Sequence, residues 1–256
     1  MTATFRAVAM VAVVLAAALW LAAPVDAGYE ELFRKVRASA WAVYVRTPGG
    51  MNAVCSATAV RSDATHTDLV SAGHCFIGSD LARTDFLVTQ DHRAFHRANL
   101  HRTGLRPRGP DKATSTSLDD YRGHDWAIIR ADVGHQPVFP VGDARKLVIG
   151  EDLVVVGVPF GMDFLAVQGI VGSLDMNLSQ LVWNHYYGAN VFVAGGNSGS
   201  GVISVRQGAV VGIVDAGPGP QSSLMIFAPI HLVGLDPSGE TRSGYAPDPF
   251  AEKSAP

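Results

Sequence analysis

The chain has 256 residues, enough for one large domain or two small ones with a buried core. Charged residues make up 17% of the sequence, and the formal net charge is −3 at pH 7. This balance provides no global basic field, so it argues against nucleic acid as a partner.

Residues 1–27 have the pattern of a signal peptide. Arg6 supplies a positive charge, an apolar run follows over residues 7–23, and residues 25–27 (VDA) match an A-x-A-like cleavage site. We predict cleavage after Ala27 and an exported protein, periplasmic or extracellular, with no membrane contact after cleavage. The alternative is an uncleaved anchor that holds the protein at the membrane, because the run approaches the roughly 17 to 20 residues that cross a bilayer. The alanine-rich run and Pro24 favour cleavage.

From residue 39 onward, short segments rich in Val, Ile, Leu and aromatic residues alternate with Gly, Asn, Asp and Pro. This pattern predicts an all-β fold, preceded by one short amphipathic helix over residues 28–38. A turn at Gln207-Gly208 divides one long segment into a hairpin. The predicted strands are residues 40–47, 54–61, 66–72, 125–131, 152–159, 165–175, 190–194, 201–217 and 224–230.

The predicted strands form two blocks, residues 39–131 and 147–236, joined by a proline-containing linker over residues 132–146. Two β-barrels or sandwiches side by side fit this arrangement. Within the first block, residues 91–124 are rich in arginine, histidine and proline and predict a long surface loop with room for a strand inside it. Residues 237–256 are poor in β-branched residues and predict a disordered tail.

The chain has two cysteines, Cys55 and Cys75. In an oxidising compartment one disulfide is the simplest arrangement, worth about 3 kcal/mol for a loop of this size. Two buried thiols are the alternative. A metal site is disfavoured, because the two cysteines lack the close spacing of paired zinc ligands. His92, His96 and His101 lie among arginines, which favours a solvated loop, and we expect neither a metal nor a cofactor.

Three segments carry residues suited to nucleophilic catalysis. "LVSAGHC" ends a predicted strand with His74, "GHDWAII" places Asp125 at the start of an apolar strand, and "GGNSGSG" places Ser198 on a tight glycine turn. A serine hydroxyl is a weak nucleophile unless an imidazole accepts its proton, and a carboxylate fixes the tautomer of that imidazole and stabilises its cation. One histidine alone is more often structural, but these three residues supply all three groups.

These segments, in the order His, Asp, Ser, resemble the three catalytic blocks of chymotrypsin-fold serine proteases. Residues 156–175 further resemble the G-x-P-x-G…V-x-x-G-I-V-S segment of the bacterial HtrA-like branch. The resemblance implies two six-stranded antiparallel β-barrels and a serine endopeptidase that cleaves protein or peptide substrates through an acyl-enzyme. In that family's arrangement His74 is the general base and then the acid, Asp125 orients it, and Ser198 is the nucleophile.

The same resemblance assigns supporting roles. The backbone N–H groups of Gly196 and Ser198 would form the oxyanion hole. Cys55 and Cys75 match the family's disulfide beside the catalytic histidine, which would limit movement of the imidazole.

The resemblance also places Phe192 at the base of the primary substrate pocket, with no carboxylate to receive Arg or Lys. We therefore expect a small or medium apolar residue before the scissile bond, at position P1. Asp215 falls near the segment that lines this pocket and would reverse that preference if its carboxylate faced the substrate. A surface or loop role for Asp215 is the alternative.

The sequence departs from the family pattern at two positions near the nucleophile. Asn197 replaces the aspartate that pairs with a new N-terminal ammonium in trypsin-type zymogens, so activation by N-terminal cleavage is not expected. Ser200-Gly201 replaces the usual Gly-Pro. No PDZ-like domain is expected after residue 236. The alternative function is a catalytically inactive chymotrypsin-fold protein that binds peptides or partners, although the presence of all three triad residues favours the enzyme.

Overall fold

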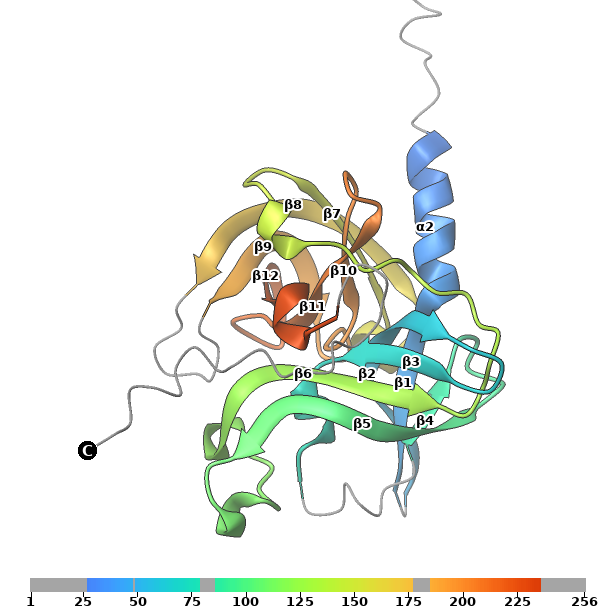
Figure 1. Ribbon diagram of the computed structural model, residues 1–256, viewed down its shortest axis with the longest axis vertical. Helices are drawn as coiled ribbons and strands as arrows, with labels where there is room; N and C mark the ends of the chain where they lie inside the picture. The colour runs from blue at the N-terminus through green and yellow to red at the C-terminus, as the bar shows by residue number, and fades with distance from the viewer. Residues whose placement is uncertain (1–26, 48, 79–85, 177–184, 236–256) are drawn as a thin grey trace, which may run out of the picture.

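A computed structural model describes residues 27–47, 49–78, 86–176 and 185–235. Most of the predicted signal peptide and the predicted tail over residues 237–256 lie outside these ranges. The described chain contains one α-helix, two β-barrels and several short 3-10 helices (Figure 1). The predicted all-β architecture of two six-stranded antiparallel barrels is confirmed.

Helix α2 spans Ala27–Ser39 and precedes the first barrel. Its apolar residues recur at the spacing of one helical face, which packs against the core through Tyr29, Leu32, Phe33 and Val36. On the exposed side, Glu31 forms ion pairs one turn along with Arg34 and Lys35. The packed face fixes the helix against the body, although its N-terminal end projects away from it (Figure 1).

The first barrel is closed in the strand order β1-β2-β3-β6-β5-β4. All neighbouring strands in it are antiparallel. Its strands are β1 (Ala40–Thr47), β2 (Gly50–Ser62), β3 (Thr67–Ser71), β4 (Phe86–Thr89), β5 (His96–Pro107) and β6 (Tyr121–Ala131).

The second barrel is closed in the order β10-β11-β12-β9-β8-β7. The predicted turn at Gln207-Gly208 lies between β10 and β11, which pair as a hairpin. The strands are β7 (Asp152–Gly157), β8 (Leu165–Met176), β9 (Tyr186–Ala194), β10 (Gly201–Ser204), β11 (Ala209–Ala216) and β12 (Gln221–Pro229). The 3-10 helices of the described chain are η1 (Gly73–Phe76), η2 (Pro110–Lys112), η3 (Leu118–Asp120), η4 (Ala144–Lys146), η5 (Pro159–Gly161) and η6 (Ile230–Val233).

The largest apolar cluster spans both barrels. It includes Val70 and Ile128 from the first barrel, and Val155 and Val211 from the second, all nearly inaccessible to solvent. Burial of such side chains contributes about 1.5 to 3 kcal/mol each. This shared core holds the barrels against one another and thereby fixes the loops that meet between them.

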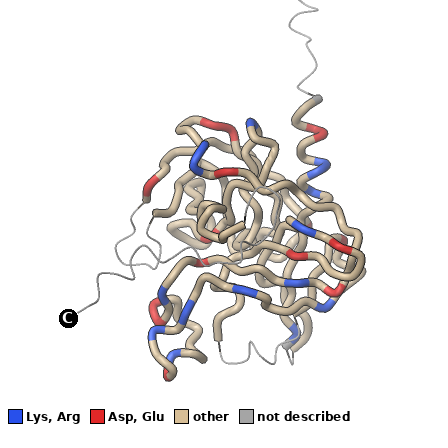
Figure 2. The backbone as a smooth tube through the Cα atoms, in the orientation of Figure 1, with Lys and Arg blue, Asp and Glu red and all other residues tan. Residues whose placement is uncertain are grey.

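Residues 91–124, predicted as a long surface loop with room for a strand, contain strand β5 and the start of β6. Strand β5 occupies residues 96–107 and pairs with β4 and β6, and only short turns and 3-10 helices separate it from β6. Arginines recur along β5 and β6 as blue segments in Figure 2. Most side chains of β5 are at least partly exposed, which is why the strand tolerates polar residues. Its composition is therefore typical of a loop, although its backbone completes the barrel.

Candidate active site

His74 and Asp125 are held together by two hydrogen bonds. His74 lies in η1, just after β3, and Asp125 lies in β6, the strand beside β3. The backbone N–H of His74 donates to Oδ1 of Asp125 at 2.6 Å, and Nδ1 of His74 pairs with Oδ2 at 2.7 Å. Because an ionised carboxylate only accepts hydrogen bonds, Nδ1 carries the hydrogen and Nε2 is left as the basic nitrogen.

Burial and charge act on the His74 imidazole in opposite directions. Burial lowers its pKa, whereas the charge of Asp125 and the hydrogen bond to it raise the pKa, and the net result is a pKa above the ordinary value of 6.5. Asp125 itself is fully buried. The carboxylate therefore orients the ring and favours its protonated form.

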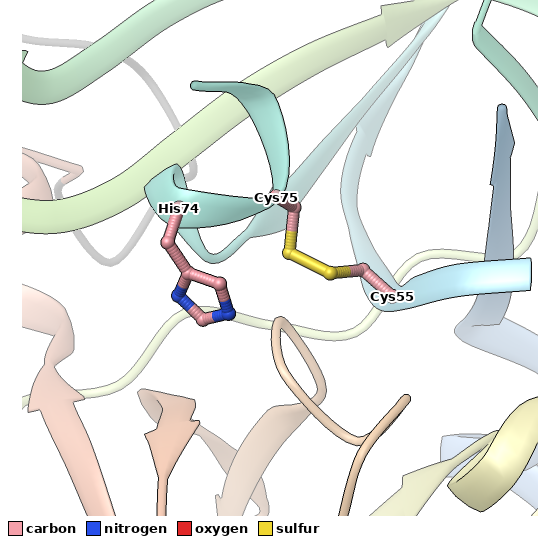
Figure 3. A group of neighbouring side chains, drawn as sticks. All are labelled: Cys55, His74 and Cys75. Atoms are coloured by element: carbon pink, nitrogen blue, oxygen red, sulfur yellow. A yellow bond between two sulfur atoms is a disulfide. The ribbon is translucent and has the colours of Figure 1, made fainter. Parts of the chain in front are cut away.

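A disulfide between Cys55 and Cys75 ties this turn to β2. The two Cα atoms are 6.3 Å apart, and the bond closes a segment of 20 residues. In Figure 3 the imidazole of His74 and the disulfide leave η1 side by side, with Cys55 reaching in from β2. The bond therefore restrains the residue next to His74, as the resemblance implied.

Ser198 lies on the turn between β9 and β10. Glycines lie on both sides of it, because the backbone at these positions adopts conformations that favour glycine. Gly196 has φ +99° and Gly199 has φ +89°. A Cβ atom would lie 2.3 Å from the carbonyl oxygen of Val158 at Gly196, and 2.1 Å from that of Ser56 at Gly199. Within the described part of the chain, the N–H groups of Gly196 and Ser198 donate no hydrogen bond. Both are free to donate to an anionic oxygen.

The hydroxyl of Ser198 donates to the backbone carbonyl of Asp215 at 3.2 Å. The carboxyl group of Asp215, a ring nitrogen of His74 and a carboxylate oxygen of Asp125 all lie within 4.8 Å of one another. The structure thus brings the three predicted residues into one neighbourhood. No hydrogen bond joins Ser198 to His74 among the described residues, so the hydroxyl must turn to meet the imidazole.

Ser56, which the sequence analysis did not single out, connects the first barrel to the nucleophile turn. Its hydroxyl donates to the carbonyl of Gly196 at 2.8 Å and accepts from the N–H of Val158 at 3.0 Å. Its backbone N–H donates to the carbonyl of Ser198 at 2.8 Å. The signal in the sequence is weak: Ser56 follows Cys55 directly, but the same strand also carries polar residues such as Thr58 and Arg61.

Tyr186 is a second residue that sequence reasoning missed. Its hydroxyl oxygen accepts a hydrogen bond from the backbone N–H of Asp125 at 2.8 Å, and its ring is fully buried. Burial raises the pKa of Tyr186 well above its ordinary value, and the nearby charge of Asp125 acts in the same direction. Tyr186 comes from β9 and Asp125 from β6, so this bond also crosses between the barrels.

A cavity of about 180 Å³ lies beside Ser198. Phe192, expected at its base, does not border it and is 37% exposed. Asp215 borders the cavity, but its carboxyl group is buried next to His74 and Asp125. The cavity is lined mainly by glycines and by apolar residues at the ends of β9 and β11 and in the turn that follows, among them Val193, Ala194, Val214, Ala216 and Pro220.

Two groups of side chains in the described chain are close enough to share a metal ion. In one, His74 lies near Cys55 and Cys75, but the cysteines are bonded to each other and offer no thiolate. The other combines His74, Asp125 and Asp215, in which both oxygens of Asp125 already pair with His74. His92, His96 and His101 belong to neither group, and His92 pairs with the hydroxyl of Tyr44 at 2.8 Å.

Comparisons with known proteins agree with this geometry. The model of the trypsin-like peptidase domain matches residues 55–213. A "Probable periplasmic serine endoprotease DegP-like" from Hahella chejuensis is 30% identical over 143 residues, which cover 56% of this chain and 29% of that protein. One of the same name from Halomonas elongata is 29% identical over 89 residues, covering 35% of this chain and 19% of that protein. The chain thus matches under a third of the length of these relatives.

Solved structures show the same fold. The HtrA-type protease AlgW, determined with a tripeptide, has a TM-score of 0.61 at 17% identity, and the match covers 81% of this chain and 62% of that one. No helix in the described ranges is long and apolar enough to cross a membrane. The two barrels and the match of the family model over residues 55–213 place this chain in the family of trypsin-like peptidase domains.

Proposed function

We propose that the protein is a serine endopeptidase, with Ser198 as nucleophile, His74 as general base and acid, and Asp125 as the residue that orients His74. The observation that carries this proposal is the double hydrogen bond between His74 and Asp125, next to a glycine turn that exposes Ser198 beside a cavity. The DegP-like relatives support the same reaction class.

The reaction begins when the Ser198 hydroxyl rotates away from the carbonyl of Asp215 toward Nε2 of His74. Nε2 removes the hydroxyl proton as Oγ attacks the peptide carbonyl, and Asp125 stabilises the resulting imidazolium. The carbonyl oxygen becomes negative and accepts hydrogen bonds from the N–H groups of Gly196 and Ser198, which have no other acceptor in the described chain.

The C–N bond then breaks as His74 gives its proton to the leaving amine, which yields an acyl-enzyme on Ser198. A water molecule, deprotonated by His74, releases the acid and restores the hydroxyl. Removing one oxyanion donor from such a site costs about 10²- to 10³-fold in rate. The orientation of the turn that carries Gly196 and Ser198 is therefore decisive for activity.

We propose that the cavity beside Ser198 receives a small or medium apolar P1 side chain. Its volume is about 180 Å³ and its walls are mainly apolar residues and glycines. The one carboxyl group at its border, that of Asp215, is 2% exposed and faces His74 and Asp125. Profiling cleavage of a peptide library should show enrichment of Ala, Val or Leu at P1; enrichment of Arg or Lys would contradict this assignment.

We also propose that the protein is exported. The relatives above are named as periplasmic, residues 1–27 have the pattern of a signal peptide, and Cys55 and Cys75 form a disulfide, which is typical of oxidising compartments. Intact mass of the exported protein under non-reducing conditions should show loss of residues 1–27 and two hydrogens fewer than the reduced form.

A fluorophosphonate probe, which reacts with an activated serine, tests the catalytic proposal. The wild type should be labelled, whereas Ser198→Ala and His74→Ala should not be. His92→Ala is the matched control, because His92 lies in the turn between β4 and β5 and bonds Tyr44, and it should be labelled like the wild type. Absence of labelling in folded wild-type protein would refute the peptidase and favour the alternative of an inactive peptide-binding protein.

A further inference from the structure

Asp215 is a buried carboxyl group for which the mechanism above has no use. It lies on β11 and is 2% exposed, and one of its carboxyl oxygens lies within 4.8 Å of a ring nitrogen of His74 and of a carboxyl oxygen of Asp125. Neither oxygen is accessible to solvent, and neither makes a hydrogen bond of normal geometry in the described chain. Two carboxyl groups thus share one buried space beside a single imidazole.

Two negative charges at this distance in a buried space repel one another strongly, which disfavours a state in which both carboxyl groups are charged. The hydrogen bonds decide which one keeps its charge. Asp125 accepts two hydrogen bonds from His74, one from the backbone N–H and one from Nδ1, and these stabilise its anion. Around Asp215, only the uncharged hydroxyl of Tyr186 and the backbone N–H of Ala228 act in this way among the described residues. Burial and the charge of Asp125 raise the pKa of Asp215 well above its ordinary value, although Tyr186 and the N–H of Ala228 oppose this.

The surrounding elements add no permanent positive charge against Asp215. Beyond His74 and Asp125, the titratable group that acts directly on Asp215 is Tyr186 on β9. His124 on β6 lies beside Tyr186, and η6, which packs on β11, carries His231. The rings of His124 and Tyr186 are 6.3 Å apart between centroids. Burial lowers the pKa of His231, which favours its neutral form. No lysine or arginine in the described ranges forms an ion pair with Asp215.

We propose that Asp215 is a positioning residue of the active site. It is a carboxylic acid, protonated at neutral pH, whose O–H is directed toward Asp125. Only one negative charge, that of Asp125, then lies beside His74. The assignment rests on the proposed peptidase function. A second ionised carboxylate would bind the proton of His74 more tightly, and the imidazole would then be a cation unable to accept the proton of Ser198. A protonated Asp215 instead directs its O–H toward Asp125 without adding a second negative charge that would hold the proton on His74.

Three variants of the full chain test the assignment, with peptide hydrolysis measured across pH. Asp215→Asn is neutral, of the same shape and still a donor, so its kcat and the acid limb of its kcat/KM profile should match the wild type, the kcat within about threefold. Asp215→Ala lacks the donor and should lower kcat about tenfold at unchanged KM. Asp175→Asn, an exposed carboxylate on β8, is the control and should change neither.

The pH profile separates positioning from mere packing. If the acid limb of Asp215→Asn moves down by about one pH unit or more, Asp215 is ionised in the wild type and the proposal is wrong. If Asp215→Asn loses as much kcat as Asp215→Ala, the O–H donor has no role and the proposal is likewise wrong.

Infrared spectroscopy decides the protonation state without activity. In the Ser198→Ala background, the carbonyl stretch of a protonated carboxylic acid should be present at neutral pH and disappear in the Ser198→Ala/Asp215→Asn protein. Absence of that band in the Ser198→Ala protein would overturn the assignment even if the protein hydrolyses peptides. Its presence would uphold the protonated Asp215 even if the protein hydrolyses none, so the two proposals fail separately.

Discussion

Replacing Ser56 with alanine removes both side-chain hydrogen bonds of the residue that joins β2 to the nucleophile turn. The hydroxyl donates to the carbonyl of Gly196 and accepts from the N–H of Val158, at 2.8 and 3.0 Å. Ser56 is fully buried, so water does not replace the lost partner. The variant leaves one carbonyl and one N–H without a hydrogen bond while it keeps the backbone contact to Ser198.

The size of the effect follows from these two orphaned groups. A buried polar group that loses its partner costs about 1 to 3 kcal/mol. We therefore expect the free energy of unfolding to fall by about 2 to 4 kcal/mol in Ser56→Ala, with part of the loss relieved by local movement. The same movement shifts the turn that carries the Gly196 and Ser198 amides, so kcat should fall about 10- to 100-fold.

Urea unfolding and hydrolysis of a peptide substrate measure the two effects on the same preparation. Ser200→Ala is a matched control, because the Ser200 hydroxyl is buried in the same turn without a hydrogen-bond partner in the described chain. Removal of this hydroxyl leaves no other polar group without a partner. The free energy of unfolding of Ser200→Ala should therefore stay within about 0.5 kcal/mol of the wild type. If Ser56→Ala behaves like Ser200→Ala in both assays, the hydrogen bonds of Ser56 do not hold the turn.

Two further predictions concern the histidine side of the site. The Cys55→Ala/Cys75→Ala protein should lose about 3 kcal/mol of unfolding free energy in a non-reducing urea titration, and unchanged stability would show that the bond does not form in the exported protein. The kcat/KM should fall as pH drops, with a midpoint above 6.5, because Asp125 raises the pKa of His74 and the protonated imidazole cannot accept the proton of Ser198. A midpoint below 6.5 would contradict the charge effect of Asp125.

Local pattern in the sequence was enough to locate most of the strands and the three candidate catalytic residues. The predicted strand over residues 40–47 is β1, and the predicted turn at Gln207-Gly208 separates β10 from β11. These elements combine apolar, β-branched segments with glycine-containing turns, so the signal lies within a few neighbouring residues. His74, Asp125 and Ser198 were identified in the same way, from short motifs around each residue.

Strands β4 and β5 were absent from the list of predicted strands. The length of β4 and the composition of β5 do not indicate strands, and they are strands because pairing with their neighbours closes the barrel. Strand β4 spans only Phe86–Thr89, and β5 is rich in arginine and histidine. Strand β4 closes the barrel by pairing with β1, which is distant in sequence, and β5 fills the place between its neighbours β4 and β6. No local pattern reports such pairing.

The surroundings of the catalytic residues were decided by tertiary structure alone. The sequence placed Asp215 near the substrate pocket, but only the folded arrangement of the two barrels brings its carboxyl group, on β11, next to His74 and Asp125. Ser56 and Tyr186 act through hydrogen bonds that join the two barrels across more than 60 residues of chain. Residue type and spacing identify a nucleophile, a base and an acid, whereas their hydrogen bonds and charges depend on groups brought together only by folding.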